Sequence, residues 1–181
     1  MKISRLRPGI LFVLIFFIFI EIISLATYKT VVLGKTEEDS ISAMKTKIEK
    51  EEVILSSDEQ EVLELINEYR AENGLSELKP FSDLQEVAKL KAEDLVNNEY
   101  FAHTSPILGT PFEMLKDNEV SYKVAGENLA GYMTAEKAVE AWINSPTHRD
   151  NILENRYEYT GIYVIDSPVY GKIFVQLFIG V

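Results

Sequence analysis

The sequence predicts an α+β domain that follows an N-terminal hydrophobic helix. Two patterns predict the domain. Apolar residues recur with helical spacing from residue 57 to about residue 153, and apolar and polar residues alternate from Tyr157 to the C-terminus. Helices and strands are therefore separated along the chain, as in an α+β fold. Hydrophobic residues make up 46% of the sequence, which is enough for a packed core.

Residues 1–28 predict export from the cytoplasm. The basic residues before the apolar segment predict that residues 1–7 stay in the cytoplasm. The segment at residues 8–28, interrupted by the charge of Glu21, is about long enough to span a bilayer. We therefore expect a transmembrane anchor with an extracytoplasmic domain. The small residues at 24–26 suit cleavage, so a removed signal peptide and a secreted domain are the alternative.

Composition narrows the classes of partner. Residues 29–56 are rich in Lys, Glu, Ser and Thr and predict a charged spacer between membrane and domain. The chain carries a net charge of −11, and without the +2 of residues 1–28 the exported part carries −13. This acidic excess, with no basic patch, excludes nucleic acid as a partner. The absence of cysteine excludes disulfides and thiolate metal sites.

Three helices are predicted in the first half of the domain, which we place at residues 57–181. Each combines an apolar stripe with a capping residue at its start. They are expected from Ser57 to Asn73, from Ser82 or Asp83 to Asn97, and from Thr110 to Lys116. Ser57 and Gln60 have the spacing of a capping box, and Gly74 suits the left-handed residue that follows a helix.

Two further helices should meet at Ser145-Pro146. Residues Thr134 to Asn144 predict an amphipathic helix that buries Trp142. Ser145 should cap the next helix and Pro146 should open it, which places His148 in its first turn. The helix dipole there disfavours an imidazolium, and a neutral imidazole can bind a metal or accept a proton. The alternative is that His148 only covers the corner.

Loops and a hairpin complete the domain. Tyr100 to Pro106 is an irregular stretch that contains the second histidine, and Gly126 to Gly131 predicts a tight loop bounded by glycines. Alternation predicts strands at Tyr159–Ile165 and Lys172–Ile179, joined by a turn at Asp166–Gly171.

Three side chains are the candidates for chemistry. His103 and His148 lie too far apart in the sequence for a local metal motif, so the fold has to bring them together. Glu127 is the carboxylate that we expect to join them, although a solvated loop glutamate is the alternative. Two imidazoles and one carboxylate would form an open site for a divalent cation, with zinc as the best match. Ser145 with His148 as its base is a different arrangement, but capping already accounts for Ser145.

Five sequence motifs follow one another along the chain: Leu63–Leu75, Tyr100–Pro106, Gly126–Ala130, Trp142–Leu153 and Gln176–Gly180. Together they resemble the CAP/SCP/PR-1 superfamily, and in particular its bacterial YkwD-like branch. The resemblance covers about residues 57–181. It implies a three-layer α-β-α sandwich with a central cleft, in which His103, Glu127 and His148 match residues that bind zinc or another divalent cation in several members.

The resemblance also implies a function. Ser145 stands where many eukaryotic members have a further cleft glutamate, and Asp150 would replace that carboxylate only if it turned into the cleft. We therefore expect a membrane-anchored module that binds a divalent metal and a lipid, glycan or peptide of the cell envelope. The alternative is a metal- or His/Glu-dependent hydrolase of envelope material, with His103, Glu127 and His148 as its catalytic candidates. A cleft that serves only protein contact is a third possibility.

Overall fold

The computed structural model describes residues 37–48 and 52–181 of the chain. The predicted cytoplasmic N-terminus, residues 1–7, and the predicted anchor or signal peptide, residues 8–28, lie outside the described residues. Within the described ranges, no helix is long and apolar enough to cross a membrane. Helix α2 (Glu37–Ile48) falls inside the predicted spacer.

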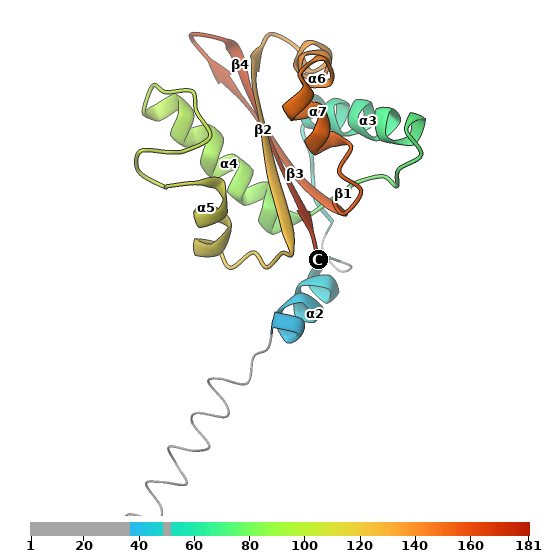
Figure 1. Ribbon diagram of the computed structural model, residues 1–181. Coiled ribbons are helices and arrows are strands. Elements are labelled where there is room, and N and C mark those ends of the chain that lie inside the picture. The colour runs from blue at the N-terminus through green and yellow to red at the C-terminus, as the bar shows by residue number, and fades with distance from the viewer. Residues whose placement is uncertain (1–36, 49–51) are drawn as a thin grey trace, which may run out of the picture. The chain divides into compact units, whose positions relative to one another are not determined.

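The domain is built from one sheet and five helices that follow α2. The strands are β1 (Lys79–Pro80), β2 (Val124–Tyr132), β3 (Tyr159–Ser167) and β4 (Gly171–Gly180). The helices are α3 (Ser57–Glu72), α4 (Ser82–Asn97), α5 (Pro111–Asp117), α6 (Ala135–Asn144) and α7 (Pro146–Ile152). Figure 1 shows α4 and α5 on one side of the sheet and α3, α6 and α7 on the other. This confirms the α+β, three-layer sandwich.

The sheet has the strand order β1-β3-β4-β2. Strands β3 and β4 form the predicted antiparallel hairpin, and β2 pairs antiparallel with the other side of β4. The two-residue strand β1, which the sequence patterns did not predict, runs parallel to β3. Strand β4 is therefore central, and β2 lies at an edge.

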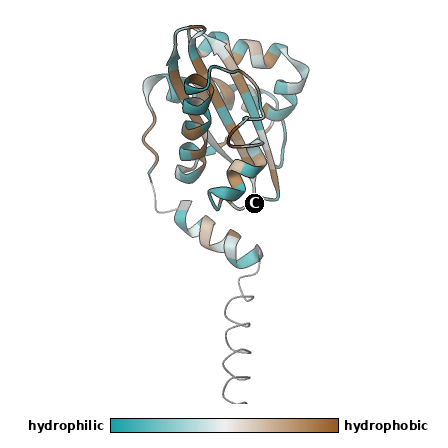
Figure 2. Ribbon diagram, turned by 90° about the vertical axis from the view of Figure 1, so that its left-hand side faces the viewer, coloured by the Kyte–Doolittle hydropathy of each residue, from teal (hydrophilic) through white to brown (hydrophobic). Residues whose placement is uncertain are grey.

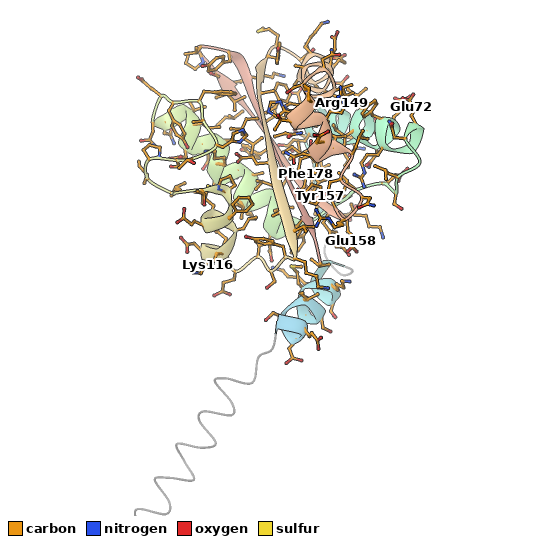
Figure 3. All side chains as sticks on the ribbon, in the orientation of Figure 1. Glu72, Lys116, Arg149, Tyr157, Glu158 and Phe178 are labelled. Carbon is orange, nitrogen blue, oxygen red and sulfur yellow. The ribbon has the colours of Figure 1, made fainter. Side chains whose placement is uncertain are left out.

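The alternation of side chains along β4 divides the core into two halves. Its odd-numbered residues from Ile173 to Ile179 pack with α4 and α5, whereas Phe174 and Phe178 pack with α3 and α6. Phe178 stacks on Tyr157, with ring centroids 5.2 Å apart (Figure 3). In Figure 2, hydrophobic and hydrophilic residues accordingly alternate along the strands and the helices.

Helix α3 begins with a capping box one residue earlier than predicted. Ser56 is the N-cap and Glu59 its partner, so the assignment to Ser57 and Gln60 was wrong. One oxygen of Glu59 accepts from the Ser56 N–H at 2.8 Å, and the other accepts from Val164 N–H of β3 at 3.2 Å. Glu59 therefore caps the helix and ties it to the sheet, which Gln60 is not placed to do.

The glycine-bounded segment Gly126–Gly131 is not a loop, and that prediction was wrong. It forms the middle of strand β2. A Cβ atom at Gly126 would stand 2.4 Å from the hydroxyl of Tyr157, and one at Gly131 would stand 2.8 Å from the ring of Tyr170. These glycines therefore permit close packing against the strand, whereas the prediction took them as turn residues.

Candidate functional site

The candidate site lies at the β2 edge of the sheet, between the segment that follows α4 and helix α7. Side chains alternate along β2, so Glu127 and Leu129 point to the same face. Leu129 packs in the half of the core that contains α4. Asn128 points to the opposite face, toward α7, where its side-chain amide donates to the carbonyl of His148 at 3.1 Å.

Glu127 holds His103 by a short hydrogen bond. Nδ1 of His103 and Oε1 of Glu127 are 2.7 Å apart. The Glu127 side chain is only 3% exposed, whereas that of His103 is 55% exposed. The second carboxylate oxygen, Oε2, is buried and has no hydrogen-bond partner among the residues that the structure describes. One oxygen thus orients the imidazole, and the other remains available to a proton donor or a cation.

The structure places the ring of His148 near that of His103. The ring centroids of His103 and His148 are 6.4 Å apart, and the ring planes are inclined by 43°. The side-chain amide of Asn151 donates to Glu127 O at 3.1 Å and to Asn128 Oδ1 at 2.9 Å, which ties α7 to β2. The sequence patterns did not single out Asn128 and Asn151, whose roles depend on contacts between distant segments.

The pKa values of His103, Glu127 and His148 shift in different directions. The hydrogen bond that the His103 ring donates to Glu127 raises the pKa of His103, although burial opposes the rise. Burial raises the pKa of Glu127, and His103 and the buried ammonium of Lys91 oppose that rise. Burial, followed by the nearby charge of His103, lowers the pKa of His148. The lowered pKa favours the neutral form of His148, which is the form that can bind a metal.

A pocket of about 360 Å³ opens beside His148. Its walls combine aromatic side chains with the end of β2 and the corner between α6 and α7. The lining residues are Phe101, Leu129, Ala130, Gly131, Tyr132, Ala141, Trp142, Ser145, His148 and Tyr170. Trp142 is 1% exposed, as predicted, and its indole N–H donates to Leu129 O at 3.0 Å. The tryptophan thus supports the pocket from below and fixes β2 two residues from Glu127.

Comparison with known protein families matches residues 63–178 to CAP, the cysteine-rich secretory protein family. The chain belongs to the CAP family. It has 42% identity over 127 residues to YkwD of Bacillus subtilis, covering 70% of this chain and 48% of YkwD. The membrane protein YlbC of the same organism is 35% identical over 129 residues, covering 71% of this chain and 37% of YlbC. This CAP protein thus spans about half or less of these two relatives.

Comparison of the fold with solved structures agrees with the assignment to the CAP family. The crystal structure of an extracellular protein containing a SCP domain from Bacillus anthracis superposes with a TM-score of 0.64 at 29% identity. The match covers 72% of this chain and 45% of that one. The CAP domain is therefore related to bacterial extracellular and membrane proteins.

Ser145 does not cap helix α7 of the CAP domain with its side chain, so that expectation was wrong. Its backbone both ends α6, by donating to Ala141 O and Trp142 O, and precedes Pro146, which opens α7 as predicted. The residue shared by two helices is extended, and its side chain lines the pocket with His148. Asp150, which the sequence offered as a substitute carboxylate, is exposed.

Metal ligation by three side chains of the CAP domain stays a prediction. Across residues 37–48 and 52–181, no group of three or more His, Asp or Glu side chains is arranged to hold a metal ion. Because Oε1 of Glu127 accepts from His103, the carboxylate is placed to orient one imidazole. The two imidazoles are then the nitrogen donors that the geometry offers, and Oε2 of Glu127 is a carboxylate oxygen without a partner among the described residues.

Proposed function

We propose that the CAP domain works outside the cytoplasm as a binding module whose cleft holds a divalent cation and an envelope ligand. The observation that carries the proposal is Glu127, a buried carboxylate with one oxygen on Nδ1 of His103 and the other without a partner. Histidines that bind metals commonly donate their second ring N–H to a carboxylate, which fixes the tautomer and raises the basicity of the free nitrogen. The arrangement therefore suits a histidine ligand.

The residues fit a zinc ion better than magnesium or calcium. His103 and His148 would hold the ion, and Glu127 would orient His103. Imidazole nitrogens bind zinc at about 2.0–2.1 Å, whereas magnesium and calcium prefer oxygen donors. The ring centroids are 6.4 Å apart, so the two rings would have to approach by about 1 Å for one tetrahedral ion to contact both. A bound ion would supply Lewis acidity to a ligand oxygen or to water.

The pocket beside His148 supports an organic ligand next to the cation. Its volume of about 360 Å³ is near the lower end of ligand sites, so it suits part of a larger molecule. The side chains of Phe101, Tyr132 and Tyr170 line it, and these suit apolar chains, sugar rings or peptide side chains. A lipid, glycan or peptide of the envelope is therefore the ligand class that we propose, with residues 8–28 as the membrane anchor, or a secreted domain if they are cleaved.

One observation favours hydrolysis as the second candidate. Ser145 makes no side-chain capping bond and shares the pocket wall with His148. A hydrolase would use His103, Glu127 and His148 for proton transfer or metal binding, with envelope material as the substrate.

Zinc-dependent stabilisation tests the binding proposal. The full chain in detergent micelles should melt at a higher temperature with zinc, since a ligand at 100 times its Kd adds about 2.7 kcal/mol. His148→Ala should abolish this rise and leave the metal-free melting temperature nearly unchanged. His103→Ala should abolish it and also lower the metal-free value, because Glu127 loses its partner. The exposed Glu77→Gln is the matched control and should keep the full response.

If zinc does not raise the melting temperature of the wild-type protein at neutral pH, the metal part of the proposal is wrong. The hydrolase alternative needs a separate assay, in which isolated cell-wall and peptide substrates are incubated with and without zinc. Turnover that disappears in Ser145→Ala or Glu127→Gln would replace the binding module with an enzyme.

A further inference from the structure

Lys91 places a positive charge beneath the candidate site. The residue lies on α4, and none of it is exposed to solvent. An ammonium group is costly to bury unless its N–H groups and charge are matched. All three N–H groups have acceptors, namely Tyr100 Oη at 2.9 Å, Ala102 O at 2.8 Å and His103 O at 2.9 Å. Lys91 therefore binds the backbone of the residue whose ring meets Glu127.

The segment that carries His103 has little burial to hold it. Residues 101 to 104 are all exposed. At the far end, Ser105 anchors the segment, since its N–H donates to Gly109 O at 2.8 Å and its hydroxyl accepts from Ile107 N and Leu108 N. At the near end, two of the three N–H groups of Lys91 hold consecutive carbonyls. The position of the His103 backbone thus depends mainly on hydrogen bonds, and the ring of Phe101 on Tyr170 is the packing contact beside them.

Neighbouring groups fix the direction of the ammonium. The hydroxyl of Tyr100 accepts from Lys91 and donates to the carboxylate of Asp94, one helical turn along α4. The other oxygen of Asp94 accepts from the Asn98 side chain at 2.7 Å. Tyr100 also offers its ring to the ammonium, 4.9 Å from the ring centroid. This chain of contacts holds Lys91 under the loop in a single orientation.

We propose that Lys91 is a positioning residue, which keeps the His103 imidazole aligned with Glu127 by holding the carbonyls of Ala102 and His103 from below. A neutral amide could also donate to two carbonyls, but only Lys91 adds a positive charge that acts on the Glu127 carboxylate. The consequence for metal binding rests on the proposed function. The consequence for the hydrogen bond between His103 and Glu127 does not.

Nuclear magnetic resonance of the His103 ring tests the proposal without any metal. In the full chain in micelles, the Nδ1 proton should exchange slowly, and the ring nitrogens should report a single tautomer. Lys91→Met keeps most of the length of the side chain and removes the ammonium. The slowly exchanging Nδ1 proton of His103 should then be lost, and the chemical shifts of its ring nitrogens should move toward those of a mixture of tautomers. Lys89→Met, a partly exposed lysine on the same helix, is the matched control and should leave the ring signals unchanged.

Tyr100→Phe keeps the test decisive if Lys91→Met does not fold. It removes only the hydroxyl between Lys91 and Asp94, and it should weaken the slow proton signal of His103 in a folded protein. Unchanged His103 signals in a folded Lys91→Met protein, or in Tyr100→Phe when Lys91→Met is unfolded, would overturn the proposal and leave Lys91 a purely structural residue. An equal change in Lys89→Met would also overturn it.

Zinc titration then gives the link to the proposed function. Loss of a group that orients a histidine ligand commonly lowers metal affinity by about 10–100-fold. Lys91→Met should show a loss of that size, and Lys89→Met should bind like the wild type. If the wild type binds no zinc, the proposed function fails, whereas the resonance test still decides the role of Lys91.

Discussion

Replacing Trp142 with alanine should lower the free energy of unfolding by about 3–5 kcal/mol. The side chain is 1% exposed and packs between α6 and the sheet. A buried tryptophan removes about 150–250 Å² from water, which at about 25 cal/mol per Å² sets an upper limit of roughly 4–6 kcal/mol. The carbonyl of Leu129 would also lose its indole donor.

Trp142→Phe separates these two contributions. It keeps most of the apolar ring but removes the N–H, so the cost should be that of one buried carbonyl without a donor, about 1–3 kcal/mol. Tyr132→Ala is the control on the same pocket wall, because Tyr132 is 42% exposed and should cost less than about 1 kcal/mol. Urea unfolding of the full chain, followed by circular dichroism since the only tryptophan is lost, gives all three values. A cost well under 1 kcal/mol for Trp142→Ala would refute the burial argument.

Three further outcomes follow from the packing and the charges. Gly161→Ala should destabilise the domain by about 1–3 kcal/mol in urea unfolding, because its Cβ would stand 2.3 Å from the backbone carbonyl of Leu84 on α4; unchanged stability would contradict this close approach. Arg70→Met should lower the melting temperature in calorimetry by several degrees or more, because the buried guanidinium donates to four backbone carbonyls, while the exposed Lys79→Met should not. Because the pKa of His103 is raised in the folded state, its stabilising contribution is complete below about pH 6.5 and is lost as the pH rises through the folded value. The stability difference between wild type and His103→Asn should therefore shrink with rising pH, and a difference that grows would contradict the assigned shift.

Local signals were sufficient for the corner that carries His148. Thr134 caps α6 through a bond from Lys137 N–H, and Pro146 opens α7, so residues adjacent in sequence fix both helix starts. Burial of Trp142 followed from the amphipathic pattern of α6. The α+β class could likewise be predicted, because the helical spacing of apolar residues ends near Tyr157 and apolar and polar residues alternate after it.

Contacts between segments that are distant in the sequence could not be predicted from local patterns. Gly126 has the same local signature in a turn as in a tightly packed strand, and Tyr157, 31 residues later in the sequence, decides between them. The family resemblance pointed to His103 and Glu127, but which oxygen meets which ring nitrogen depends on the completed sheet. Lys91 lies on the buried face of α4, and its three acceptors belong to residues beyond the helix, so the helical pattern alone could not assign its role.

Both edges of the sheet have features that disfavour the addition of another strand. On one side, β1 has two residues, and one of them is Pro80, which has no N–H to donate. On the other side, side chains already occupy two carbonyls of β2, since Asn151 donates to Glu127 O and Trp142 donates to Leu129 O. Exposed strand edges are templates for aggregation. The same side chains that shape the cleft thus also leave fewer free carbonyls on β2 for pairing with another strand.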